Sequence, residues 1–204
     1  MRNKRVVVDS DDVRQDDPEA SAMAVCLRLL TAAPRTRAQL EEALHRRGIP
    51  PRAADAVMER LIRAKLIDDA AFAQAWVETR HYSRGLARRA LSAELRQRGV
   101  DEDSVQDAVA ELSPEQEEAA ARRMVAAKLA ATRGRPLPTR MRRLMGLLAR
   151  KGYPPGLAYR VVREALDQEG IDLAESGIDL DAMLDADTSS DADDPQPPTP
   201  DDEI

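Results

Sequence analysis

A short pattern of two leucines, a glycine and one more apolar residue occurs three times and constrains the fold more than any other feature. Its copies are Leu40, Leu44, Gly48 and Ile49; Leu91, Leu95, Gly99 and Val100; and Leu144, Leu148, Gly152 and Tyr153. Leucines four residues apart share one face of a helix, and a glycine is the usual left-handed residue that ends one. The glycines are 51 and 53 residues apart, so the sequence predicts an internal repeat of about 50 residues.

The register of apolar residues continues beyond each glycine. Matched positions are Val57, Met58 and Leu61; Ala108, Val109 and Leu112; and Val161, Val162 and Ala165. Amphipathic helices can resemble one another by chance, but a register shared on both sides of the glycine argues against this alternative. Each repeat is therefore predicted to contain three helices.

Several residues mark predicted helix starts. Thr36 to Gln39 reads as a capping box, and Ser113 to Gln116 reads as a second one with a proline at the first helical position. Asp68 or Asp69 is expected to cap the helix that carries Phe72 and Trp76. In repeat 3, Thr139 is expected to cap the helix that follows the loop at 134–138.

The composition favours an all-α fold. Apolar residues make up 43% of the chain and aromatic residues, which favour strands, only 2%. No apolar run approaches the roughly 18 residues that span a bilayer, and the basic N-terminus lacks a signal-peptide core. The single cysteine, Cys26, forms no internal disulfide, which suits a reducing cytoplasm.

The predicted domain organisation is three repeats between two tails. The segments are a disordered tail at 1–19, repeat 1 at 20–67, repeat 2 at 68–112, repeat 3 at 113–168 and an acidic, mostly disordered tail at 169–204.

Charge is distributed unevenly along the chain. The net charge is −6, but residues 167–204 hold 14 acidic groups and no basic ones, whereas residues 20–166 carry a net +10. Residues 119–163 contain 12 Arg or Lys and no Asp or Glu. The chain is thus a basic body with an acidic tail, and that tail could fold back on the body and compete with DNA. A merely solubilising tail is the alternative.

Catalysis finds little support in the sequence. His45 and His81 are not in a metal-ligand spacing, Cys26 has no obvious base partner, and no glycine-rich phosphate loop occurs. The histidines are expected at the surface and Cys26 in the core. We therefore expect a protein without catalytic residues, metal or cofactor.

Arginines and lysines crowd the start of each middle helix and the positions just before each glycine. The candidate binding residues are Arg84, Arg88, Arg89, Arg96, Arg98, Arg140, Arg142, Arg143, Arg150 and Lys151. In a repeated unit they would form a recurring basic line that suits a phosphate backbone or an acidic protein groove. A solvated, functionless charge run is the alternative. Sparse aromatic residues argue against a base-stacking platform.

Two stretches resemble a known family. Leu66 to Ala73 reads LIDDAAFA, and Leu91 to Val100 reads LSAELRQRGV after Arg84-Gly85. These strongly resemble the RecX family of recombinase regulators, and the resemblance extends over about residues 22–166. It implies an extended, curved all-α array of three three-helix, helix-turn-helix-like repeats.

The resemblance also implies a function. Members of that family bind the RecA filament, restrain its recombinase, ATPase and coprotease activities, and bind DNA, in the context of recombination, DNA repair and the SOS response. The basic positions matched to the family are Arg88, Arg89, Arg96 and Arg98; those of repeat 3 rest on charge. We expect a cytoplasmic monomer that contacts RecA and the phosphates of single- or double-stranded DNA, and no membrane. A RecA-independent DNA-binding protein of helix-turn-helix type and an α-repeat scaffold are the alternatives.

Overall fold

The structure is a computed structural model and describes residues 17–170. Its elements are α1 (Pro18–Ala32), α2 (Arg37–Arg46), α3 (Pro51–Arg63), α4 (Asp69–Arg84), α5 (Arg88–Gln97), α6 (Glu102–Ala110), α7 (Pro114–Leu129), the 3-10 turn η1 (Ala130–Thr132), α8 (Leu137–Arg150) and α9 (Pro155–Gln168). No strand occurs within residues 17–170, so the predicted all-α fold class is confirmed. The predicted tails lie largely outside the described residues.

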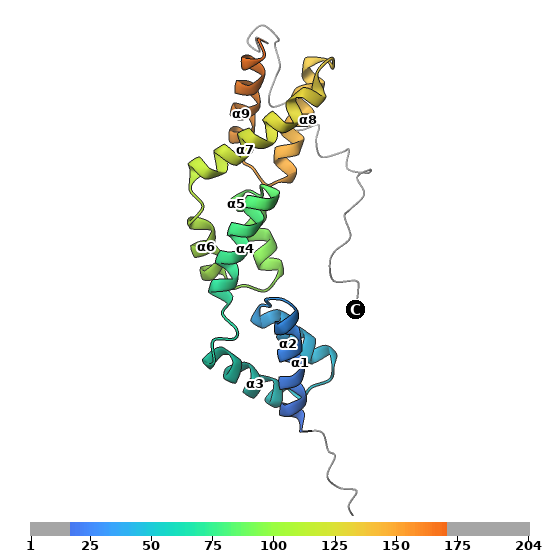
Figure 1. Cartoon of the computed structure of the whole chain (residues 1–204), viewed down its shortest axis with the longest axis vertical. Helices are drawn as coiled ribbons and strands as arrows, with labels where there is room; N and C mark the ends of the chain where they lie inside the picture. Colours follow the sequence, from blue (N-terminus) through green and yellow to red (C-terminus); the bar gives the residue numbers. More distant parts are fainter. Residues whose placement is uncertain (1–16, 171–204) are drawn as a thin grey trace, which may run out of the picture. The chain divides into compact units, whose positions relative to one another are not determined.

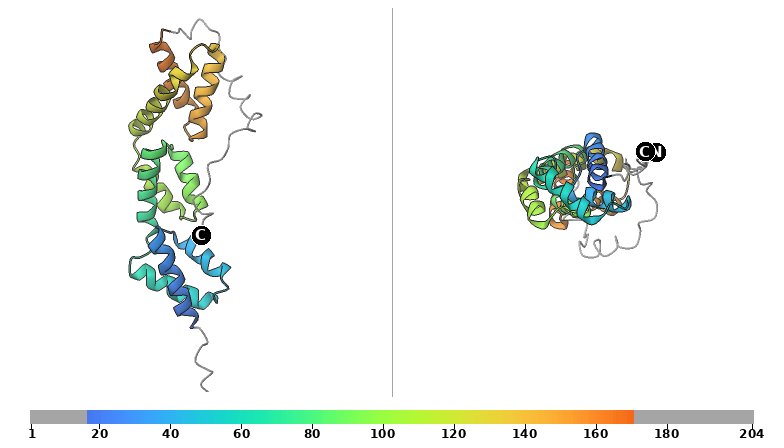
Figure 2. Two further views of the ribbon diagram at one scale, coloured as in Figure 1. Left: turned by 45° about the vertical axis from the view of Figure 1, so that its right-hand side comes forward. Right: turned by 90° about the horizontal axis from the view of Figure 1, so that it is seen from below.

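The chain forms two compact units. Of the described residues, 17–114 belong to the first unit, which contains the helices of repeats 1 and 2, and 115–170 belong to the second. In the first unit α1, α2 and α3 pack on one another, as do α4, α5 and α6 (Figures 1 and 2). In the second unit α8 and α9 pack side by side.

The middle helix of each repeat ends in the same hydrogen-bonded turn. In repeat 1 the Ile49 N–H donates to the Leu44 carbonyl and the Gly48 N–H to the His45 carbonyl. The same pair of bonds closes α5 at Gly99 and Val100 and α8 at Gly152 and Tyr153. This is the Schellman motif, which needs a left-handed residue; Gly48, Gly99 and Gly152 have φ of 70°, 77° and 83°. The three predicted glycine stops are confirmed.

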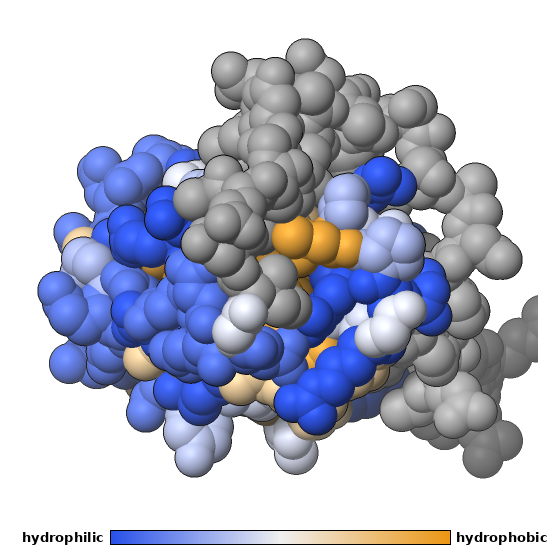
Figure 3. Space-filling model, turned by 90° about the horizontal axis from the view of Figure 1, so that it is seen from above, coloured by the Kyte–Doolittle hydropathy of each residue, from blue (hydrophilic) through white to orange (hydrophobic). Residues whose placement is uncertain are grey.

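Each repeat has its own core, built from the matched apolar positions. One cluster joins Cys26, Leu40, Leu44 and Val57 with their neighbours, and a second gathers the equivalent residues of repeat 2 around Leu91 and Leu95. In repeat 3, Leu144, Leu148, Tyr153, Val161 and Val162 are buried. Full burial of one such side chain stabilises the fold by about 1.5–3 kcal/mol. In Figure 3 the visible surface of the described residues is mostly hydrophilic, with apolar residues in small areas only.

Most predicted helix starts are confirmed, and one is wrong. Thr36 and Gln39 form the capping box, and Asp68 Oδ1 accepts from the Ala71 N–H at 2.9 Å. Thr139, by contrast, lies inside the first turn of α8, which begins at Leu137. The helix starts earlier because Pro138 occupies a first-turn position, where its missing N–H costs no hydrogen bond.

Helix α1 also begins slightly earlier than the predicted limit of the N-terminal tail. Asp17 caps it by accepting from the Glu19 N–H at 3.0 Å, and Pro18 is its first residue. Proline and an acidic residue both suit a helix N-terminus, because the first backbone N–H groups have no partner within the helix.

Repeats 1 and 2 are joined at the N-terminus of α2. The buried Thr36 hydroxyl donates to the Arg98 carbonyl at 2.6 Å, and the Arg37 N–H donates to Asp69 Oδ1 at 2.9 Å. Gly99 is so close to α2 that a Cβ placed on it would lie 2.3 Å from Ala38 Cβ. The start of one repeat's middle helix therefore contacts the end of the next one's.

Candidate functional site

The ten predicted binding residues fall into two groups, one held by contacts within the chain and the other without an ion-pair partner within residues 17–170. Arg88, Arg96, Arg98 and Arg140 form the first group. The second group, called the open basic residues below, consists of Arg84, Arg89, Arg142, Arg143, Arg150 and Lys151. The binding role of all ten residues stays a prediction.

Arg98 is half-buried against Trp76. Its guanidinium carbon lies 3.8 Å from the indole centroid, and that of Arg80 lies at 4.1 Å, so two cations contact one ring. The indole N–H donates to Glu94 at 2.8 Å, and Phe72 stacks on the ring with centroids 5.6 Å apart. Arg98 thus ties the end of α5 to α4 and has a structural task.

Arg88 and Arg96 connect the ends of α5 to α6. Arg88 Nη2 donates to the carbonyl of Leu112, just beyond α6. Arg96 binds Glu102 with two hydrogen bonds of 2.7 Å, and this pairing, with help from Gln106, lowers the pKa of Glu102 to about 2. Both arginines therefore have intramolecular partners in repeat 2.

Arg140 is buried in the second unit, with 5% of its surface exposed. Its Nε donates to Thr132 Oγ1 at 3.1 Å, and its Nη2 pairs with Glu169, whose pKa is lowered by Arg140 and Arg133. A buried, paired guanidinium has no free edge to offer a phosphate. Arg140 is therefore not available to bind a ligand in this arrangement.

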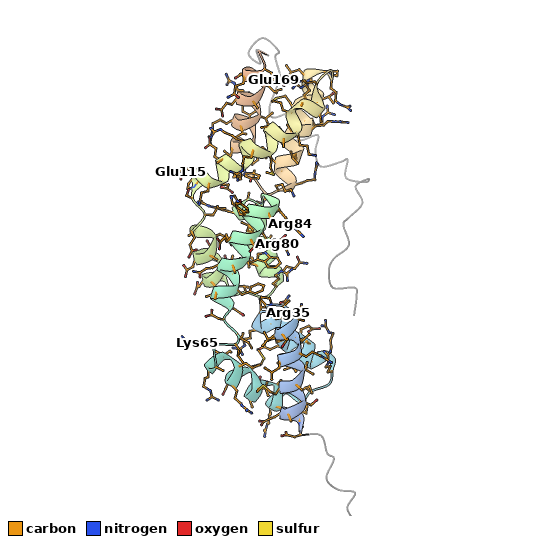
Figure 4. All side chains as sticks on the ribbon, viewed as in Figure 1. Arg35, Lys65, Arg80, Arg84, Glu115 and Glu169 are labelled. Carbon is orange, nitrogen blue, oxygen red and sulfur yellow. The ribbon has the colours of Figure 1, made fainter. Side chains whose placement is uncertain are left out.

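The open basic residues lie in two places. Arg84 ends α4 (Figure 4). Arg89 lies in the first turn of α5, beyond the turn made by Gly85. Arg142, Arg143 and Arg150 lie along α8, and Lys151 caps its end. All are exposed except the half-buried Lys151, and none has an ion-pair partner within residues 17–170.

Sequence reasoning did not single out Arg80, and it included the basic groups of α7 and α9 only as part of the acid-free block 119–163. Tyr82 is 88% exposed beside the Arg84 end of α4. Arg122, Arg160 and Arg163 line a shallow groove, where Arg122 and Arg160 pair with Glu164 and Glu118 at 3.1 and 3.0 Å. These carboxylates come just before and after the acid-free block, so only the packing of α7 and α9 brings the pairs together.

Catalytic geometry is not evident in the described residues. No cluster of three or more His, Cys, Asp or Glu suitable for a metal occurs within residues 17–170. Burial raises the pKa of the Cys26 thiol, which disfavours the reactive thiolate. His45 is exposed, and His81 is half-buried with Nδ1 2.9 Å from the Leu86 carbonyl. Among the described helices, none combines the length and apolarity needed to span a membrane.

Comparisons with known proteins bear on this arrangement. Residues 22–61 match the family described as "RecX, first three-helix domain", and residues 68–109 match "RecX, second three-helix domain". A regulatory protein RecX from Thermobifida fusca is 62% identical over 158 residues, which cover 78% of this chain and 85% of that protein. The chain belongs to the RecX family.

Other RecX proteins are also similar to this chain in sequence or in fold. The regulatory protein RecX of Streptomyces coelicolor is 57% identical over 161 residues, covering 79% of this chain and 86% of that protein. A crystal structure of RecX from Lactobacillus salivarius aligns with a TM-score of 0.67 at 18% identity, over 72% of this chain and 96% of that one. Another RecX structure aligns with a TM-score of 0.65 at 24% identity, over 72% of each chain. Both structures share the fold of this RecX protein.

Proposed function

We propose that this protein binds RecA and its nucleoprotein filament and restrains recombinase, ATPase and coprotease activity. Membership of the RecX regulatory family supports the proposal. The observation that carries it is the set of open basic residues, which lie in both compact units without ion-pair partners among the described residues. The role is regulatory and non-catalytic, requires no cofactor, and belongs in the cytoplasm, with a monomer as the acting species.

The proposed mechanism is steric and electrostatic. Arg84 and Arg89 in one unit, and the basic residues of α8 in the other, would contact DNA phosphates or acidic groups of the filament. Because such contacts release counterions, they supply affinity without sequence readout. A chain bound through both units resists the subunit rearrangements that accompany ATP turnover.

A RecA-independent DNA-binding protein of helix-turn-helix type is the second candidate. The same open basic residues favour it, since they suit bare DNA phosphates as well as a filament. It predicts salt-sensitive DNA binding without any effect on RecA.

The deciding experiment measures DNA-dependent ATP hydrolysis by preformed RecA filaments, with this protein added at substoichiometric amounts. We expect a clear fall with the unaltered protein, and a much weaker fall with the double variant Arg84→Ala and Arg89→Ala. Substituting Arg88 or Arg98 instead would also remove contacts that hold repeat 2 together.

The matched control removes two arginines that already have carboxylate partners, with Arg122→Ala and Arg160→Ala. This control should inhibit nearly as well as the unaltered protein. An unchanged ATPase rate with the unaltered protein, alongside tight salt-sensitive binding to bare DNA, would favour the second candidate.

A further inference from the structure

Helix α8 carries a basic face with no partner in the described residues. Arg143 and Arg150 are seven residues apart, so they lie on one side of the helix, about 10 Å from each other. Arg142 and Lys151 flank them. These four residues, the α8 basic face, have no ion-pair partner within residues 17–170. Four like charges gathered without counter-charges favour an acidic or phosphorylated occupant.

The acidic end of the chain starts beside this helix. Helix α9 packs against α8, and the short connection between them makes the two helices antiparallel. Glu169 lies just after α9 (Figure 4). It pairs with Arg140 near the start of α8 and with Arg133 at 2.9 Å. The chain therefore leaves α9 with a carboxylate already bound to basic groups of this unit.

The sequence beyond Gly170 is opposite in charge to the α8 basic face and long enough to reach it. Residues 171–204 hold 12 carboxylates and no Arg or Lys. Arg140 and Arg150 are separated by about 15 Å of helix, a span that five extended residues cover. Asp172 and Glu175 are thus within reach of α8, with most of the carboxylates still to follow.

We propose that residues 171–204 dock on the α8 basic face and compete there with polyanionic ligands. Each exposed ion pair is weak, but the segment is tethered, so its local concentration is in the millimolar range. At low salt, several such weak ion pairs together hold the segment on the α8 basic face. The segment leaves when high salt screens the ion pairs or when a stronger polyanion displaces it. The contact is intramolecular and does not depend on RecA.

The direct test places a nitroxide label in the full-length chain at Ala192→Cys. Buried Cys26, with its raised thiol pKa, reacts slowly, so the label goes to the new cysteine. At about 50 mM salt we expect paramagnetic broadening of backbone amides across residues 142–151, lost at about 500 mM. The control keeps the tail length and label but replaces every Asp and Glu from 172 to 203 by Asn and Gln. Unbroadened α8 amides, or equal broadening with the neutral tail, would overturn the proposal.

A competition measurement tests the consequence with inorganic polyphosphate as the polyanion. At low salt the neutral-tail chain should bind about 10-fold more tightly than the unaltered chain. This difference should vanish in the quadruple variant Arg142→Ala, Arg143→Ala, Arg150→Ala and Lys151→Ala, and persist in the control Arg122→Ala and Arg160→Ala. Equal affinities for the two tails would also reject docking. Neither measurement contains RecA or DNA, so its failure is separate from failure of the proposed function.

Discussion

Gly48 and Gly99 occupy the same position in successive repeats, and their surroundings differ. Both adopt a left-handed φ, of 70° and 77°. Nothing lies within 4 Å of a Cβ built on Gly48, whereas one built on Gly99 meets Ala38 at 2.3 Å. Glycine is needed for backbone conformation at the first position, and for conformation and space at the second.

We therefore expect unequal costs when the two glycines are replaced. Gly48→Ala should lower the free energy of unfolding by about 1 kcal/mol, the cost of a left-handed alanine. Gly99→Ala should lower it by about 3 kcal/mol, because overpacking against α2 is added. Urea unfolding followed by circular dichroism measures both. Similar losses for the two variants would mean that the contact between α2 and the end of α5 yields easily.

Arginines that are close together in the sequence have different surroundings in the folded chain. Arg88 and Arg89 are neighbours, yet Arg88 binds the Leu112 carbonyl while Arg89 is exposed. Arg140 and Arg142 differ in the same way, because Arg140 points into the unit toward Glu169. The intramolecular partner determines whether a basic side chain remains available for a ligand.

At the scale of elements, the end of α9 is fixed by its charge contacts with α8 and with the loop before it. Glu169 has a lowered pKa because Arg140 and Arg133 favour its ionised form. A carboxylate with a lowered folded-state pKa contributes stability above its ordinary pKa. That contribution disappears as the pH falls through the folded-state value.

Glu169→Gln should therefore reduce stability at neutral pH and weaken the loss of stability that occurs as the pH falls below about 4.5. Thermal unfolding between pH 7 and pH 3 measures both effects. Glu59→Gln, which removes an exposed carboxylate of α3, serves as the matched control. A Glu169→Gln curve parallel to that of the unaltered protein would show that this ion pair does not contribute to the pH dependence.

At the scale of the whole molecule, the sequence pI of about 5.1 hides the charge relevant to binding. The open basic residues are six cations on a body whose net charge is +10 between residues 20 and 166. Exposed charges of this kind attract polyanions strongly at low salt and weakly at high salt.

If all six open basic residues contact single-stranded DNA, log K should fall with log salt with a slope of about −4. The quadruple variant of the α8 basic face retains only Arg84 and Arg89, so its slope should be about −1.4. Fluorescence anisotropy with a labelled oligonucleotide between about 50 and 300 mM salt measures the slopes. Identical slopes for the two proteins would place the DNA contacts elsewhere on the chain.

The repeat and its helix ends were determined by the sequence alone, because their causes are local. Leu40 and Leu44 are one turn apart, Gly48 supplies a left-handed φ, and the Thr36 capping box closes over three residues. Sequence preferences that act over only a few residues have the same effect in each repeat. They do not decide where neighbouring signals compete, as at Thr139, where the helix begins at Leu137 and Pro138 occupies its first turn.

Only the tertiary structure decided which basic residues are held and which remain open. Arg88 reaches a carbonyl 24 positions away, Arg140 a carboxylate 29 positions away, and Thr36 a carbonyl 62 positions away. Such pairs depend on how helices pack, and a charged residue carries the same local signal whether or not a distant partner approaches it. The sequence therefore determined a helical repeat rich in arginine. The packing of its helices decided which six of the ten predicted binding residues have no ion-pair partner within residues 17–170.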